Sequence, residues 1–317
     1  GPLADTLHQT FIQNIDLWRQ KMKVSRHGHP WVAPPRNLHE TPEGERKAIL
    51  EAGWQAGGLG FRESFYDILL DSRSNNIMSN FIRDKIRDIV HDPATAEMLV
   101  PYDHPFGTKR PPIDTDYFET YNRDNVSLVD IRTNPIKKID RTGVCLEDGT
   151  DVVADIIVFA TGFDAMTGAL LKMGIVGRDG LTLAEAWTGG PQTYLGLAIY
   201  GFPNLFTITG PGSPSVLTNM PRAIEQHIDW ITALLRRAES LSISLIEAEL
   251  SATQDWTNHV TAVANDTLLP QAGHSWYLGA NVPGKPRVFM PYCKGLDVFG
   301  AHCEQVAAEG YPGFRLR

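Results

Sequence analysis

Ala160, Thr161 and Gly162 form the most informative candidate site in this sequence, because they directly follow an apolar strand. The run Ile156 to Ala160 is wholly apolar and predicts a central strand that is covered on both faces. Gly162 permits the close approach of a backbone or ligand where a Cβ atom would clash. A strand that ends in such a small turn indicates a dinucleotide site, and an ordinary α/β strand and loop is the alternative interpretation.

A second candidate site lies where a predicted helix begins, shortly after a strand and the loop Thr209 to Pro214. Asn219 is a good N-cap residue, and Pro221 suits a first helical turn. The expected apolar face of this helix consists of Ile224, Ile228, Ile231 and Leu235. Free N–H groups at the helix start offer a site for an anionic or carbonyl-bearing group, such as a phosphate or the pyrimidine edge of a flavin, and simple capping is the alternative.

Residue types that bind metals occur in the sequence without the spacing of a metal site. His27 and His29 have no third ligand spaced to join them, so we expect a loop there and no metal. The cysteines at 145, 293 and 303 are odd in number and lack paired CxxC spacing. This pattern argues against a disulfide framework or structural zinc and predicts reduced, structural cysteines.

The elements that must position these residues change in character along the chain. Residues 1 to about 108 have apolar residues at helical spacing, interrupted by Pro and Gly clusters, and predict short helices. From Lys109 onward short strands are predicted at residues 126–128, 136–139, 144–146, 156–160 and 205–208. Asp148 and Gly149 predict a tight hairpin turn with positive φ angles. Residues 240 to 270 are expected to form one more helix.

Composition limits the class of protein. The 317 residues are 42% hydrophobic, which is enough for a substantial core and predicts roughly two domains. The 29 basic and 37 acidic residues give a charge of −8 without a basic run, which argues against nucleic-acid binding. The sequence contains neither an apolar stretch of roughly 20 residues nor a signal-like N-terminus, so we expect a soluble cytoplasmic protein.

Five ordered segments of the sequence resemble the type I Baeyer–Villiger monooxygenases, a family of class B flavoprotein monooxygenases. They are GTKRPPIDTDYFETYNRDNVSLVD from Gly107, ATGFDAMTG from Ala160, FPNLFTITGPGSPS from Phe202, IEQHIDW from Ile224 and SWYLGANVPGKPR from Ser275. The resemblance covers essentially the whole chain and is closest to enzymes acting on cyclic and aryl ketones. It implies an enzyme that uses FAD, NADPH and O2 to convert small-molecule ketones to esters or lactones through a C4a-peroxyflavin.

Three motifs of that family are missing from this sequence. The family has two GxGxxG turns and an FxGxxxHxxxW fingerprint, whereas Gly58-Leu59-Gly60 lacks the third glycine of such a turn. The chain therefore resembles the C-terminal portion of such an enzyme. The implied fold class is an α/β, Rossmann-like flavoprotein with two dinucleotide-binding domains and a helical insertion, lacking the N-terminal nucleotide-binding elements.

The resemblance also implies domain limits and a partner. Residues 1–108 correspond to the helical insertion subdomain, 109–168 to the remaining part of the NADP-binding domain, and 169–317 to the C-terminal half of the FAD-binding domain. The expected partner is the N-terminal portion of the same enzyme, which is cleaved, disordered or on another polypeptide. No nucleic-acid or membrane partner is expected.

The resemblance assigns roles to three residues in particular. Arg110 occupies the position of the active-site arginine, whose permanent charge favours the deprotonated peroxide and the oxyanionic adduct. Lys109 matches a position that binds NADP, where an ammonium suits a phosphate. Trp276 matches a tryptophan that contacts the nicotinamide cofactor. The respective alternatives are a surface or ion-paired arginine, a solvated lysine and a core aromatic residue.

Two further segments acquire roles from the same resemblance. Leu217, Thr218, Asn219 and Met220 match a loop that lines the ketone pocket and approaches the flavin. Thr161, Gly162 and Asp164 fit a hinge-like passage between the two nucleotide domains, with expected cofactor and conformational roles. Because an apolar pocket wall requires only suitable size, these positions do not identify the ketone.

Two other functions remain open from the sequence. One is a flavin N- or S-oxygenase, since the missing fingerprint would have separated the two reaction types. The other is a catalytically empty fragment that acts only as a structural partner of another chain, which the missing glycine-rich turns favour.

Overall fold

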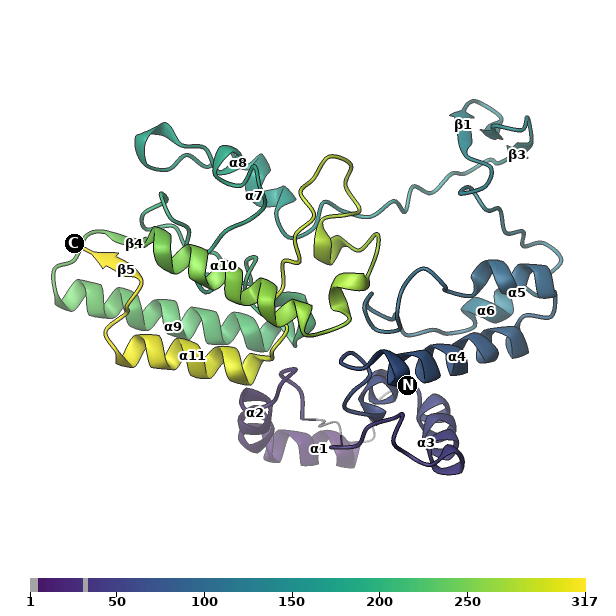
Figure 1. The fold of residues 1–317 in the computed structure, drawn as a ribbon, viewed down its shortest axis with the longest axis horizontal. Coiled ribbons are helices and arrows are strands. Elements are labelled where there is room, and N and C mark those ends of the chain that lie inside the picture. Colours follow the sequence, from purple (N-terminus) through teal and green to yellow (C-terminus); the bar gives the residue numbers. More distant parts are fainter. Residues whose placement is uncertain (1–4, 31–33) are drawn as a thin grey trace.

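The computed structural model describes residues 5–30 and 34–317. Figure 1 shows two mainly helical bodies and a small sheet that stands apart from both on extended connections. We call residues 34–122 the N-terminal body and residues 164–317 the C-terminal body; residues 5–30 form a helical segment that precedes them. Within the described residues, no helix combines the length and apolarity needed to cross a membrane.

The N-terminal body is helical, as its apolar periodicity predicts. The segment that precedes it contains α1 (Asp5–Gln13) and α2 (Ile15–Lys23). The body itself contains α3 (Glu43–Ala56), α4 (Ser72–Ile89), α5 (Pro93–Leu99) and α6 (Tyr117–Thr120). Asp92 caps α5 by accepting a 2.8 Å hydrogen bond from the Thr95 amide, and Pro93 occupies the first turn. Leu50, Phe61 and Met78 are buried together in the core of this body.

The small sheet contains three antiparallel strands, β1 (Ile136–Ile139), β2 (Gly143–Leu146) and β3 (Asp151–Val153). The predicted strands at 136–139 and 144–146 are confirmed, as is the hairpin turn that follows them. In that turn Gly149 has a positive φ of 89°, whereas Asp148 does not, so a single left-handed residue is sufficient. The turn closes through a hydrogen bond from the Leu146 amide to the Thr150 carbonyl.

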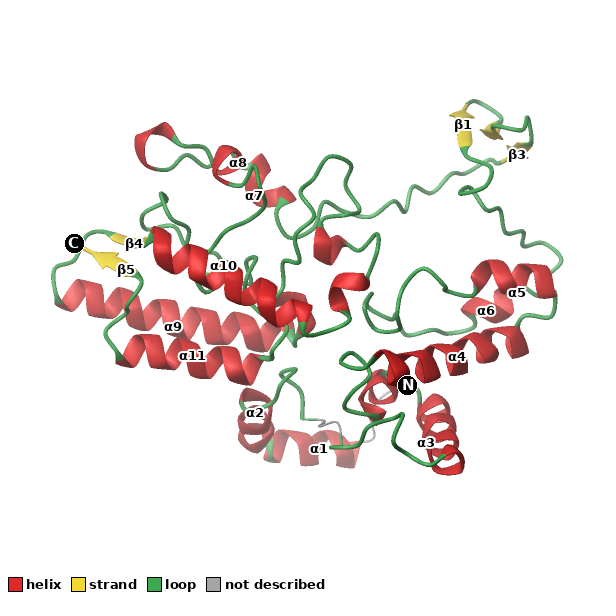
Figure 2. Cartoon of the chain, in the orientation of Figure 1, coloured by secondary structure: helices red, strands yellow, loops and turns green. Residues whose placement is uncertain are grey.

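The predicted central strand at 156–160 is wrong for this structure. The segment is extended but irregular, as Figure 2 shows for the connection between β3 and α7 (Gly168–Lys172). Ile156, Val158 and Phe159 are 83%, 81% and 71% exposed. A strand requires neighbouring backbone to complete its hydrogen bonds, and no described strand pairs with this segment.

Two other predicted strands are also wrong, for the same reason. Residues 126–128 are irregular, and in residues 205–208 only Phe206 makes an isolated bridge, to Ala198. Apolar and β-branched composition predicted these strands, but strand formation depends on a partner strand that composition does not supply.

The C-terminal body contains the largest core of the described structure. Its remaining helices are α8 (Leu183–Ala186), α9 (Met220–Ser240), α10 (Leu250–Asn265) and α11 (Leu296–Ala308), and β4 (Ile246–Ala248) pairs with β5 (Phe314–Leu316). Figure 1 shows the long helices α9, α10 and α11 packed together. The helix predicted within 240–270 is therefore confirmed only for 250–265, because β4 occupies the residues just before it.

The buried face of α9 matches the predicted one only in part, since Ile231 is buried as predicted. Ile228 and Leu235 are 44% and 48% exposed, whereas His227, Trp230 and Leu234 are buried. The Trp230 indole donates a 2.8 Å hydrogen bond to the Cys303 carbonyl of α11, so the aromatic residues face the core. Asn219 is the N-cap residue, as predicted, but its side chain makes no capping hydrogen bond.

His227 connects α9 to the loop that precedes it. The Thr209 amide donates a 2.9 Å hydrogen bond to His227 Nδ1, so the ring is neutral and carries its proton on Nε2. Burial lowers the pKa of His227 from 6.5 to about 4. Protonation would therefore require both desolvation of a charge and loss of the hydrogen bond from Thr209.

The depressed pKa of His227 predicts a loss of stability in mild acid. Because the unfolded chain binds the proton first, the His227 contribution is complete above pH 6.5 and is lost as the pH falls towards 4, at about 1.4 kcal/mol per pH unit. His227→Asn retains an acceptor for the Thr209 amide but does not titrate, so its free energy of unfolding should depend less steeply on pH in this range. Urea unfolding at several pH values measures this slope, with exposed His91→Asn as control; equal slopes for wild type and His227→Asn would contradict the prediction.

Candidate functional site

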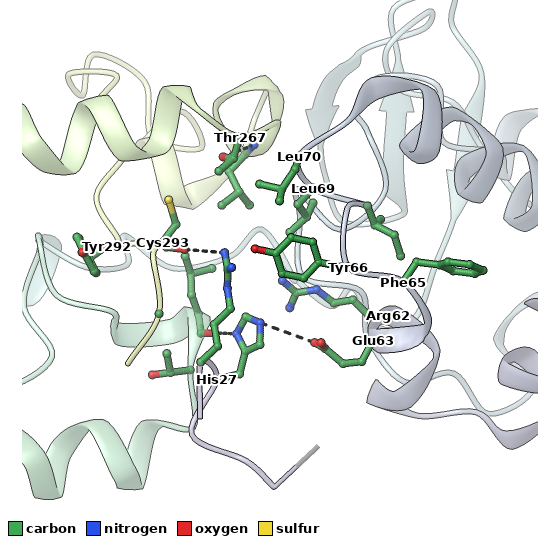
Figure 3. Close-up of a pocket in the computed structure, with 16 residues that line it drawn as sticks. His27, Arg62, Glu63, Phe65, Tyr66, Leu69, Leu70, Thr267, Tyr292 and Cys293 are labelled. Carbon is green, nitrogen blue, oxygen red and sulfur yellow. Dashed lines mark hydrogen bonds and ion pairs between the residues drawn. The ribbon is translucent and has the colours of Figure 1, made fainter. Parts of the chain in front are cut away.

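The main pocket lies where the N-terminal body meets the C-terminal body. It encloses about 730 Å³, part of which is continuous with solvent. Figure 3 shows Arg62, Glu63 and Tyr66 on one side and Thr267 and Cys293 on the other. Charged groups therefore come mainly from the N-terminal half of the chain, while the C-terminal body supplies most of the uncharged wall.

The predicted substrate-pocket residues are only partly gathered at this pocket. Leu217 and Thr218 line it, from the turn just before α9. Met220 is the first residue of α9 and lies outside the lining, and Asn219 is its N-cap residue. The segment 217–220 thus leads from the pocket wall into the N-terminus of a long helix.

Trp276 belongs to the same apolar cluster as Leu217. It lies in a short 3₁₀ turn, Trp276–Leu278, that Ser275 caps by accepting a hydrogen bond from the Tyr277 amide. Its indole packs edge-on against the ring of Tyr277 at 4.5 Å between ring centroids. Leu217, Trp276 and Leu69 all pack against a buried cluster that includes Tyr277, so the cluster also joins the two bodies.

Arg110 lies close enough to Tyr277 and Arg62 to affect both electrostatically. Burial raises the pKa of Tyr277, and the positive charges of Arg110 and Arg62 oppose this rise. Arg110 is exposed, and no described carboxylate lies within ion-pair distance of its guanidinium. It is therefore a cation that remains available to an anionic ligand.

Arg110 does not line the pocket, whereas Arg62 and Arg26 do. Burial lowers the pKa of Arg62, Glu63 opposes this effect, and the nearby charges of Arg26 and Arg110 reinforce it. Three guanidinium groups thus gather around one region, with Glu63 as the nearest carboxylate. Such an excess of positive charge fits phosphate groups of a nucleotide or negative charge that develops on oxygen during a reaction.

Lys109 is already paired within this chain. Its ammonium lies 3.0 Å from a carboxylate oxygen of Asp103. Burial raises the pKa of Asp103, but hydrogen bonds from His104 and Lys109 outweigh this effect and lower it to about 2. A phosphate that binds Lys109 would therefore share the lysine with Asp103.

The predicted hinge-like passage is held at one end only. Thr161 and Gly162 are exposed, and Gly162 has a φ of 88°, which explains the glycine without any close neighbour in this chain. Asp164, by contrast, accepts a 2.5 Å hydrogen bond from the ammonium of Lys285. Lys285 also donates to the Ala165 carbonyl at 3.2 Å, so the passage is attached to the loop that contains Trp276.

Of the pocket lining, sequence reasoning identified only Leu217 and Thr218, and it missed the charged and histidine side chains, which are those of Arg26, His27, Arg62 and Glu63. The loop predicted at His27 and His29 is present, but His27 contacts the pocket instead of solvent. The described residues contain no group of three His, Cys, Asp or Glu side chains arranged for a metal. A charged Arg-Glu pair between Phe61 and Phe65 was a usable signal, because charges within an apolar run require a specific partner.

Curated relatives of this chain are monooxygenases. No protein-family model matches the sequence. The chain is 41% identical to cyclohexanone 1,2-monooxygenase of Acinetobacter sp over 273 residues, which are 84% of this chain and 49% of that protein. It is 40% identical to acetone monooxygenase (methyl acetate-forming) of Gordonia sp. (strain TY-5), over all of this chain and 56% of that protein. It is 42% identical to phenazine N-monooxygenase PhzNO1 of Lysobacter antibioticus, over 86% of this chain and 50% of that protein.

Solved structures resemble the chain over its whole length. The crystal structure of OTEMO in complex with FAD and NADP matches with a TM-score of 0.95 and 36% identity, covering 100% of this chain and 58% of that one. The closed crystal structure of cyclohexanone monooxygenase matches with a TM-score of 0.94 and 37% identity, covering 100% and 59%. The predicted fold class is confirmed, and the chain spans about half the length of the curated relatives it matches.

The Asp164–Lys285 pair predicts that the passage depends on Lys285. In Lys285→Ala, amide hydrogen exchange of residues 160–168 should become about tenfold faster, because a hydrogen bond between charged groups is lost. Hydrogen-exchange mass spectrometry measures this change, and Lys172→Ala, on the exposed surface of α7, is the control. Unchanged exchange in Lys285→Ala would mean that the ion pair does not hold the passage.

Proposed function

We propose that this chain, which belongs to the Baeyer–Villiger monooxygenase family, works within an FAD- and NADPH-dependent enzyme that converts ketones to esters or lactones. It corresponds to the C-terminal part of the family members that it matches. The observation that supports this function most directly is the placement of Arg110. An exposed guanidinium without a carboxylate partner in the described chain lies near Tyr277, whose apolar cluster includes the pocket residue Leu217.

The cofactors supply the electrons that activate O2 when they are bound. Lys109 and Trp276 are the residues proposed to hold NADP, through the phosphate and the nicotinamide respectively. Thr161, Gly162 and Asp164 are proposed to contact the cofactors in the passage between the two nucleotide domains. Asn219 and Met220 are proposed to approach the flavin from the start of α9. The excess of guanidinium charge near the pocket fits the negative charge of both nucleotides.

Arg110 is proposed as the catalytic residue. Addition of an oxygen nucleophile to a ketone places negative charge on the carbonyl oxygen, and a fixed cation lowers the energy of that charge. A guanidinium remains protonated throughout, so Arg110 acts by charge and hydrogen bonding and does not transfer a proton. Leu217 and Thr218 are proposed to orient the ketone through the shape of the pocket wall, and Met220, at the start of α9, is proposed as a further substrate contact beside that wall.

Replacing Arg110 tests this role. In the complete enzyme, Arg110→Ala should lower ester formation by about 100-fold or more while NADPH oxidation continues, because charge stabilisation is lost and cofactor binding is retained. Product analysis by gas chromatography beside absorbance at the NADPH band measures both, with the exposed Arg141→Ala as control. A normal ester yield from Arg110→Ala would remove this residue from the mechanism.

Nitrogen oxidation is the second candidate reaction, because one relative at 42% identity is a phenazine N-monooxygenase. Sulfur oxidation belongs to the same alternative, since both use the same oxygen donor. A competition assay with cyclohexanone and phenazine would distinguish ketone from nitrogen oxidation. Exclusive formation of the N-oxide would replace the ketone assignment.

The N-terminal portion of the enzyme is proposed to cover the exposed apolar passage. Ile156, Val158, Phe159 and Phe163 present 71 to 88% of their surfaces to solvent, which is unusual for large apolar residues so close together in one segment. In this arrangement residues 1–108 are the helical insertion, 109–168 complete the NADP-binding domain and 169–317 complete the FAD-binding domain. We place the enzyme in the cytoplasm.

This arrangement predicts a difference between the chain alone and the completed enzyme. The chain alone should bind a hydrophobic dye such as ANS, because the apolar passage is exposed. It should show no flavin absorption, because it lacks the glycine-rich turns that bind dinucleotides. Addition or co-expression of the N-terminal portion should reduce dye fluorescence and give a flavin band near about 450 nm that NADPH bleaches. Strong flavin binding by this chain alone would contradict the arrangement, whereas no flavin binding by the completed enzyme would contradict the proposed function.

A further inference from the structure

The segment Arg26 to Gly28 crosses the pocket wall and contacts the turn that carries Leu217. The Asn219 amide donates a 2.8 Å hydrogen bond to the His27 carbonyl, and His27 Nδ1 donates a 3.2 Å hydrogen bond to the Leu217 carbonyl. A Cβ atom on Gly28 would lie 3.0 Å from Cβ of Asn219, which shows how closely the two backbones pass. One residue, His27, therefore bonds to both ends of the Leu217–Asn219 turn.

The same segment is fixed on its other side. The Leu296 amide donates a 2.8 Å hydrogen bond to the Arg26 carbonyl, and the Arg26 guanidinium donates to the Cys293 carbonyl at 3.3 Å. Because Arg26 is attached to the start of α11, the position of His27 is defined independently of the 217–219 turn. The segment can thus transmit a fixed position to the turn that connects the loop before it to the N-terminus of α9.

The state of the His27 ring follows from its neighbours. Burial and the positive charge of Arg62 lower the pKa of His27 to about 4, although Glu63 opposes them, so the ring is neutral near pH 7. Because a carbonyl oxygen only accepts, the proton resides on Nδ1 and points at Leu217. Nε2 faces a carboxylate oxygen of Glu63 at 3.8 Å, as Figure 3 shows.

We propose that His27 is a positioning residue for the substrate-binding wall, where its Nδ1–H fixes the carbonyl of Leu217 and thereby the orientation of Leu217 and Thr218. This proposal rests on the proposed function, because it assigns a role within the same pocket. His27 touches neither the cofactors nor the reacting atoms in this role. It sets the geometry of the wall, and small displacements of a wall alter substrate orientation.

Two isosteric substitutions separate the hydrogen bond from the bulk of the side chain. His27→Asn places an amide N–H near the position of Nδ1, whereas His27→Gln places it near Nε2, away from the Leu217 carbonyl. In the complete enzyme, His27→Gln should raise the KM for the ketone about three- to tenfold while kcat changes less. His27→Asn should keep a KM close to that of the wild type, because it retains the hydrogen bond to Leu217. The ratio of the two esters formed from an unsymmetrical ketone should shift in His27→Gln only.

A measurement without catalysis completes the test. Amide hydrogen exchange of residues 215–219 in the purified chain should be about three- to tenfold faster in His27→Gln than in His27→Asn, with exposed His91→Gln as the control. Equal exchange, equal KM and equal product ratios for the two variants would overturn the proposal. A wild-type enzyme that forms no ester would refute the proposed function, while the exchange rates would still decide whether His27 holds the turn.

Discussion

The pocket depends on a few backbone hydrogen bonds that join segments far apart in sequence. The Leu268 amide donates to the Leu69 carbonyl at 2.8 Å and thereby links the two bodies directly. Arg26 and His27 provide two more such bonds, to residues 296 and 219. Backbone groups buried at a junction must be paired, so these bonds restrict the junction to one arrangement. The charged residues on one side can then face the uncharged wall on the other.

Charge at this junction is organised around an excess of cations. The positive charges of Arg26 and Arg110 lower the pKa of the buried Arg62, and Glu63 opposes this effect. Burying a guanidinium near other cations is unfavourable without an anionic partner. The proposed enzyme resolves this cost by binding anionic cofactors and by stabilising negative charge on oxygen. The local fold and the proposed chemistry therefore follow from the same electrostatic arrangement.

The exposed passage has the opposite character, since it presents apolar side chains without a partner strand. Ile156 to Ala160 had the composition of a covered strand, yet the segment is extended and irregular here. Similarly, Ile228 and Leu235 fitted an apolar helix face but are exposed, since Trp230 and His227 face α11 instead. The strand prediction at 156–160 was wrong, whereas the helix containing Ile228 and Leu235 was correct but its buried face only in part; in both cases the neighbouring elements decided the outcome.

The sequence by itself determined the helical character of the N-terminal body, the Asp148-Gly149 turn and the family to which the chain belongs. These features depend on local periodicity, on turn chemistry and on ordered motifs, all of which are written in consecutive residues. Only the tertiary structure brought His27, Arg62 and Leu217 to one pocket, and it paired Asp164 with Lys285 across 121 positions. Contacts between distant segments depend on how whole bodies pack, and neither residue type nor local spacing encodes that packing in readable form.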